Sequence, residues 1–188
     1  GTDNACVNTA WTAYSANLVA KMAAAIGETA ISEKYMAIFE NYKAAFNRAF
    51  VAEDATTSSD YQTAYAMGLQ FGLYPDDMIE LATQKLVDNI QRNGNHLKTG
   101  FAGISFLNPA LSDHGNTELA YTLLEQEEYP SWLYAVANGS TTIYEQLDGY
   151  MEYEDGTYRL TGSLNHYSYG AISEWLYRYS AGIERDEA

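Results

Sequence analysis

Glu145 is the residue with the clearest chemical potential, because it stands among aromatic side chains in an irregular part of the chain. Tyr144 precedes it, an Asp-Gly pair follows it, and Trp132 lies a short distance upstream. Aromatic faces can hold a sugar ring, and an ionised carboxylate can take a proton from water, so this combination favours sugar hydrolysis. The residues alone leave two structural roles open, since Glu145 could instead cap a turn or pair with Arg159.

Other reactive side chains form no pattern typical of a metal, cofactor or nucleophile site. His96, His114 and His166 lie on separate segments, without the i, i+4 spacing or the cysteine partner that zinc sites use. The sequence has no glycine-rich phosphate loop and no serine elbow, and Cys6 stands outside any motif. We therefore predict neither a metal nor a cofactor.

The charge balance argues against several classes of partner. Among 188 residues, 10 Lys+Arg stand against 25 Asp+Glu, a formal net charge of −15. Such a balance disfavours nucleic acids and anionic membranes as partners, and no apolar run approaches the roughly 20 residues of a membrane-spanning helix. The single cysteine cannot form an internal disulfide, and no targeting signal is expected at Gly1. The sequence leaves the compartment open.

Residue usage favours a helical fold. Only 3 prolines occur, well below the average usage of about 5%. The 17 tyrosines far outnumber the 6 phenylalanines and 3 tryptophans. A tyrosine packs one face and keeps a hydroxyl available, which suits a groove for a polar ligand, although half-buried seams between helices use the same residue.

Apolar periodicity predicts an antiparallel helix hairpin at the start of the chain. Residues 4–26 form one expected helix, with Asn4 as N-cap and Gly27 as the stop, and residues 31–49 form the second. We expect the first helix to bury a stripe of large residues, namely Val7, Trp11, Tyr14, Leu18, Met22 and Ala25.

Further helices follow in the same pattern. Asp60 is expected to cap the third, and the others span 78–90, 104–111, 117–125, 132–137 and 167–179. Residues 138–165 form an irregular stretch in which 151–159 predict a small β-hairpin, because Asp155-Gly156 suits a two-residue turn. The fold class is therefore all-α, with antiparallel helix hairpins arranged as a curved array or an α/α toroid.

Several motifs recur in an order that resembles one known family. They are 97–103 (LKTGFAG), 129–132 (YPSW), 141–145 (TTIYE), 148–149 (DG), 165–170 (NHYSYG) and 174–177 (EWLY), with weaker matches at 9–14 (TAWTAY) and 60–65 (DYQTAY). In this order the chain resembles the C-terminal half of the catalytic domain of inverting α-L-rhamnosidases, glycoside hydrolases with an (α/α)6 barrel. The resemblance extends over essentially all 188 residues.

The resemblance implies roles for particular residues. Glu145 matches the general base that activates water, and His166 matches a histidine of the sugar site. Phe101 and Trp132 match positions near the sugar-binding end of the barrel. Tyr144 stands where the family usually carries tryptophan, so the shape of the sugar site is expected to differ there.

The resemblance also implies that residues 1–188 are the C-terminal portion of the catalytic domain. The family's general acid lies in an upstream Arg-Asp-Glu segment; the same letters at 185–187 lack the surrounding pattern and are expected to form an acidic tail. A partial toroid would expose apolar helix faces, so self-association through that face is expected. The isolated chain is expected to be inactive.

Three functions follow, in descending order of support. The first is a fragment of an α-L-rhamnosidase that acts on a rhamnose-containing glycoside or polysaccharide. The second is a helical carbohydrate-binding or scaffold module without catalysis. The third is a helical-repeat interaction protein, which the aromatic loop motifs disfavour.

Overall fold

The computed structural model describes residues 2–153 and 155–184. Its described residues fall into two compact units, Gly1–Leu86 and Val87–Ala188, with the boundary inside one helix. The expected acidic tail at 185–187 lies outside the described residues. No helix among those described is long and apolar enough to cross a membrane.

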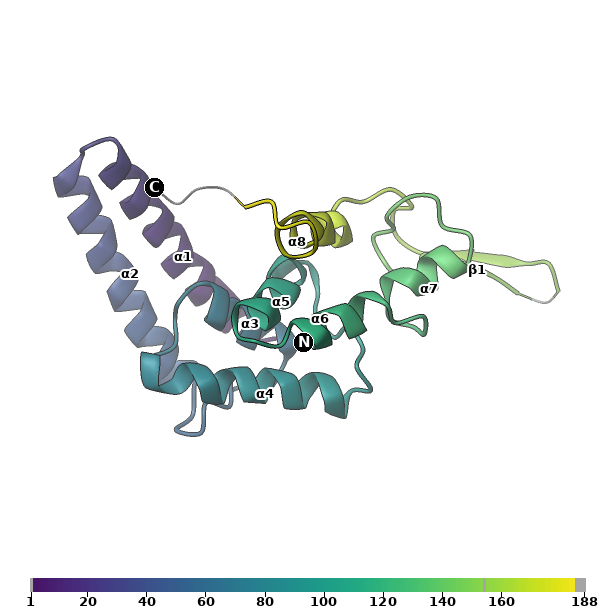
Figure 1. Ribbon diagram of the computed structural model, residues 1–188, viewed down its shortest axis with the longest axis horizontal. Coiled ribbons are helices and arrows are strands. Elements are labelled where there is room, and N and C mark those ends of the chain that lie inside the picture. Colours follow the sequence, from purple (N-terminus) through teal and green to yellow (C-terminus); the bar gives the residue numbers. More distant parts are fainter. Residues whose placement is uncertain (1, 154, 185–188) are drawn as a thin grey trace. The chain divides into compact units, whose positions relative to one another are not determined.

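The first unit begins with a helix hairpin, visible in purple and blue in Figure 1. Helix α1 (Asn4–Ala25) and helix α2 (Thr29–Phe50) lie side by side, as the sequence predicts. Asp3 rather than Asn4 is the N-cap, because its carboxylate accepts the Ala5 N–H at 3.0 Å. Gly27 ends the first helix as expected, with a positive φ of 79° that favours glycine.

The buried face of α1 is not the predicted one. The helix instead buries small residues, namely Cys6, Ala10, Ala13, Ala16, Ala20 and Ala23. Positions two apart on an α-helix are separated by 200°, so Leu18 and Met22 lie on the side opposite Ala16 and Ala20. Leu18 is 40% exposed and Met22 is 60% exposed. The buried face of α1 is therefore lined by small side chains rather than by the large ones.

Helix α3 (Gln62–Gln70) is almost entirely buried. Asp60 does not cap it: the N-cap position belongs to Tyr61, and Asp60 has a positive φ of 43°. The carboxylate of Asp60 instead accepts the Tyr65 hydroxyl at 2.8 Å. Burial, followed by this hydrogen bond, raises the pKa of Tyr65 to about 12. The tyrosine therefore remains a hydroxyl donor that fixes the loop ahead of its own helix.

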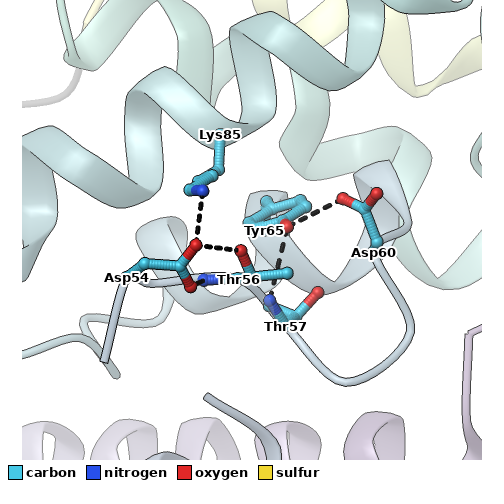
Figure 2. A network of polar contacts seen from close by, with 6 residues as sticks. All are labelled: Asp54, Thr56, Thr57, Asp60, Tyr65 and Lys85. Atoms are coloured by element: carbon cyan, nitrogen blue, oxygen red, sulfur yellow. Dashed lines mark hydrogen bonds and ion pairs between the residues drawn. The ribbon is translucent and has the colours of Figure 1, made fainter. Parts of the chain in front are cut away.

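A polar network secures the loop between α2 and α3, as Figure 2 shows. Lys85 contacts the Asp54 carboxylate at 2.7 Å, and both the N–H and the hydroxyl of Thr56 donate to the same carboxylate. These donors, Lys85 first, lower the pKa of Asp54 to about 2. Lys85 lies in helix α4 (Ile79–Arg92), which follows the 3₁₀ turn η1 (Asp76–Met78). The network thus joins the loop to α4.

The second unit is built on helix α5 (Phe101–Asp113), which contacts helix α6 (Thr117–Leu124) and the last helical segment. Helix α5 starts three residues earlier than the predicted 104–111, because Gly100 accepts the N–H groups of Gly103 and Ile104. This earlier start places Phe101 at the first position of the helix.

The last helical segment is mixed rather than a continuous α-helix. It consists of a 3₁₀ turn, η2 (Ser168–Ala171), then α8 (Ile172–Trp175) and a π turn, η3 (Leu176–Ser180). The Trp175 indole donates to Ser112 at 2.9 Å, and the Tyr179 hydroxyl donates to Asp113. Both bonds hold the segment against the C-terminal end of α5.

In the sequence, helix α7 (Trp132–Ala137) and a two-stranded antiparallel ribbon follow α6 and precede the last helical segment. Strand β1 (Tyr150–Glu152) pairs with β2 (Tyr158–Leu160), with Met151 opposite Arg159. The predicted β-hairpin is confirmed, but residues 153–157 separate its strands in place of the expected two-residue turn, and the Tyr153 N–H donates to the Thr157 carbonyl at 2.8 Å. Figure 1 shows the ribbon extending beyond α7.

Candidate active site

Phe101 and His166 lie in direct contact within the second unit. Their rings stack with centroids 4.9 Å apart and planes inclined by 20°. Tyr167 also stacks with His166, at 5.2 Å. Phe101 is 47% exposed, so the stack has an apolar surface open to a ligand. Two residues predicted from distant parts of the sequence are therefore neighbours.

The orientation of His166 follows from a backbone contact. The Ser168 N–H donates to His166 Nδ1 at 3.3 Å, which makes Nδ1 the acceptor nitrogen. In the neutral imidazole the other nitrogen, Nε2, then carries the proton and can donate to a polar ligand.

Trp132 joins the same cluster through Tyr169. Its indole N–H donates to the Tyr169 carbonyl at 2.9 Å, and the Tyr169 ring meets Phe101 edge to face at 6.0 Å. Ser131 caps α7 by accepting the Tyr134 N–H, which fixes Trp132 as the first residue of that helix. Trp132 is only 6% exposed, so its main contacts are with the protein.

Glu145 is held by the segment that carries His166. Its backbone N–H donates to the Ser163 carbonyl at 2.8 Å, and the Ser163 N–H donates to Glu145 Oε2 at 2.8 Å. Two residues before Glu145, the Ile143 carbonyl accepts the His166 N–H at 2.7 Å. We call these paired segments, 142–145 and 163–166, the clamp. The clamp fixes Glu145 and His166 on two adjacent stretches of backbone.

Tyr144 and Asp148 flank Glu145 in the sequence. Tyr144 is buried, with 9% of its surface exposed. Arg159 pairs with Asp148, and this hydrogen bond raises the pKa of the Arg159 guanidinium above its ordinary value. An ion pair between Arg159 and Glu145 is thus disfavoured, because Arg159 already pairs with the Asp148 carboxylate.

Two tyrosines extend the cluster. Burial raises the pKa of Tyr129, and the nearby Asp148 carboxylate raises it further. Burial also raises the pKa of Tyr169, with a smaller contribution from Tyr129. Both hydroxyls therefore stay protonated and able to donate hydrogen bonds at neutral pH.

Sequence reasoning missed three contributors to this arrangement. Tyr169, Gly162 and Ser163 all contact a predicted site residue, yet none was singled out. Tyr169 and Ser163 lie within three residues of His166, so proximity to a site motif was the available signal. For Gly162, nothing in the sequence except the residue type itself indicated a role in the site.

The described residues include no group of three or more His, Cys, Asp or Glu side chains arranged to hold a metal ion. His96 Nε2 lies 3.9 Å from a carboxylate oxygen of Glu128.

Comparison with known proteins decides the family. Residues 1–180 match the model of the bacterial alpha-L-rhamnosidase 6 hairpin glycosidase domain. The chain belongs to this family. Its all-α architecture of antiparallel helix hairpins agrees with membership of this six-hairpin glycosidase family.

Individual rhamnosidases are similar over nearly the whole chain. The α-L-rhamnosidase of Streptomyces avermitilis is 40% identical over 179 residues, which are 94% of this chain and 17% of that protein. One from Formosa agariphila is 38% identical over 97% of this chain and 20% of its own length. The chain therefore spans about a fifth of the curated relatives that it matches.

Solved rhamnosidase structures share the fold. The crystal structure of the S. avermitilis α-L-rhamnosidase complexed with L-rhamnose superposes with a TM-score of 0.88 at 40% identity, over 96% of this chain and 17% of that one. The native α-L-rhamnosidase from Aspergillus terreus gives a TM-score of 0.87 at 28% identity, over 94% of this chain and 21% of that one.

Proposed function

We propose that this six-hairpin glycosidase chain is the C-terminal portion of the catalytic domain of an inverting α-L-rhamnosidase. The longer enzyme would hydrolyse terminal α-L-rhamnose from a glycoside or polysaccharide. The observation that carries the proposal is the clamp, which holds the Glu145 carboxylate beside the segment bearing His166, whose ring stacks on Phe101.

In this proposal Glu145 is the general base. It removes a proton from a water molecule while the water oxygen forms a bond to the anomeric carbon of rhamnose. The bond from that carbon to the leaving oxygen breaks on the opposite face, and a general acid supplied by another part of the enzyme protonates the leaving oxygen. Inverting enzymes separate these two carboxyl groups by roughly 6.5–9.5 Å to leave room for the water.

The ring cluster would bind the sugar. Phe101 offers an exposed ring for the apolar face of the pyranose, and His166 Nε2 can donate to a sugar hydroxyl because Nδ1 is already an acceptor. Trp132 and Tyr144 would support the pocket rather than contact the sugar, since both are buried. We therefore assign direct sugar contact to Phe101 and His166, and shaping of the pocket to Trp132 and Tyr144.

The stereochemistry of the product tests the proposed reaction. When the longer enzyme cleaves an α-L-rhamnoside, the first product should be β-L-rhamnose, because water attacks opposite the leaving group. Proton NMR spectra taken within the first minutes, before mutarotation, measure the ratio of anomers. Early accumulation of α-L-rhamnose would contradict an inverting mechanism.

We also propose that the exposed face of α1 drives self-association of the 188-residue chain. Leu18 and Met22 lie on this face, opposite the buried alanines. Sedimentation equilibrium should show a mass that rises with protein concentration, and the double variant Leu18→Glu, Met22→Glu should weaken the association by about tenfold or more, since one buried leucine contributes roughly 1.5–3 kcal/mol.

A matched control adds the same charge elsewhere. Ala37→Glu with Asn41→Glu changes two exposed residues of α2 and should leave the association constant within about threefold, as surface substitutions usually do. A monomeric mass at every concentration of the unmodified chain would refute this proposal.

A further inference from the structure

We infer that Gly162 and Ser163 are positioning residues for the Glu145 base: they fix one carboxylate oxygen and leave the other for water. This inference rests on the proposed function, because it assigns their role through Glu145. The two residues form the turn by which the chain passes from β2 into the clamp.

Ser163 acts through its backbone. Its N–H donates to Glu145 Oε2 at 2.8 Å, while its carbonyl accepts the Glu145 N–H at the same distance. These two bonds restrain the main chain and the side chain of Glu145 together. A hydrogen bond to one carboxylate oxygen also fixes the plane of the group, so Oε1 presents its lone pairs in a defined direction.

Gly162 provides both the backbone conformation and the space that this contact requires. Its φ is +69°, in the left-handed region that favours glycine. A Cβ atom at this position would lie 3.0 Å from Glu145 Oε2, 3.2 Å from Cδ and 3.3 Å from Cβ. All three atoms belong to the one side chain, so any larger residue would press directly on the carboxylate.

The sugar-binding residue His166 is held by a separate bond of the clamp, from its N–H to the Ile143 carbonyl at 2.7 Å. The three atoms nearest a Cβ at Gly162 all belong to Glu145, so the displacement is expected at the carboxylate rather than at His166. Displacement of a reacting group by about 1 Å can cost 10²-fold in rate. Gly162 is therefore expected to control turnover more than substrate affinity.

The test measures kcat and KM for an aryl α-L-rhamnoside in the longer enzyme. We expect Gly162→Ala to lower kcat by about 10- to 100-fold, with KM within about threefold. The matched control is Gly139→Ala, which has a similarly positive φ of +85° but no atom within 4 Å of the added Cβ. It shares the backbone strain and should retain kcat within about threefold.

A double-mutant cycle separates positioning from a general effect on the fold. If Gly162 acts through Glu145, then Gly162→Ala should slow the Glu145→Gln enzyme by no more than about threefold, because the base is already lost. A further loss equal to that in the parent background would overturn the inference, as would a kcat for Gly162→Ala near that of the parent. Neither result would affect the assignment of Glu145, which fails only if Glu145→Gln remains active.

Melting temperatures of both glycine variants show whether each has folded. If Gly162→Ala fails to fold, Gly162→Asn replaces it, because asparagine tolerates positive φ while still adding the Cβ that crowds Glu145. The same loss of kcat is expected for that variant, and full activity would refute the inference.

Discussion

Replacing Glu145 with Gln in the longer enzyme should lower kcat by about 10²–10⁴-fold, the usual contribution of a general base. Glutamine keeps the size of the side chain and one oxygen that can still accept the Ser163 N–H at Oε2. It cannot take a proton from water, so proton transfer in the transition state is lost while sugar binding survives. Steady-state kinetics with an α-L-rhamnoside, together with binding of L-rhamnose by calorimetry, measure the two quantities separately.

Glu174 provides the control for this substitution. It is an exposed acid on α8 whose carboxylate lies 3.7 Å from Arg178. Glu174→Gln should stay within about threefold of the parent kcat, as surface changes usually do. Full activity with unchanged affinity in the Glu145→Gln enzyme would show that the base is another residue, and Asp148 would be tested next.

The same experiment separates catalysis from binding alone. A helical carbohydrate-binding module would bind sugar equally well with Glu or Gln at position 145 and would show no turnover in either form. The Glu145 experiment is therefore informative even where the parent activity is low.

The 188-residue chain alone should show no hydrolysis of methyl α-L-rhamnoside above background. An alkoxide is a poor leaving group, so cleavage needs a general acid as well as a base, and each typically contributes about 10²–10⁴-fold. The family resemblance places that acid upstream of the segment represented by this chain. Quantifying released rhamnose over several days, against a Glu145→Gln chain as the blank, measures the residual rate.

A rate near that of complete rhamnosidases would mean that this chain supplies its own acid. Folding of the chain in the assay is verified by its far-ultraviolet circular dichroism, since the described residues are largely helical.

Helix positions were predictable from the sequence, but the buried face of α1 was not. Periodicity correctly placed a helix over nearly the same residues as Asn4–Ala25, and Gly27 correctly marked its end. The prediction of the core face was wrong because it ranked residues by size. The buried face of α1 carries the alanines, and larger residues such as Leu18 lie on the opposite surface.

The contacts between the proposed site residues could not be predicted from the sequence. Phe101 and His166 are far apart in sequence, and their stacking depends on α5 beginning at Phe101 and on the turn at η2. The link between Glu145 and Ser163 depends on pairing across 18 positions, which no local pattern encodes. Whether these residues bind rhamnose stays a prediction.

The clamp has a consequence for how enzymes with this fold can diversify. Glu145 precedes the β1–β2 ribbon in the sequence and Ser163 follows it. The hydrogen bond between these two residues therefore closes the loop that contains the ribbon. Its turn at Gly156 has open space around it. Insertions or deletions there would change the length of the ribbon, while the clamp retains the carboxylate geometry. The length of the ribbon and the placement of the Glu145 carboxylate can in this way evolve independently within a single loop.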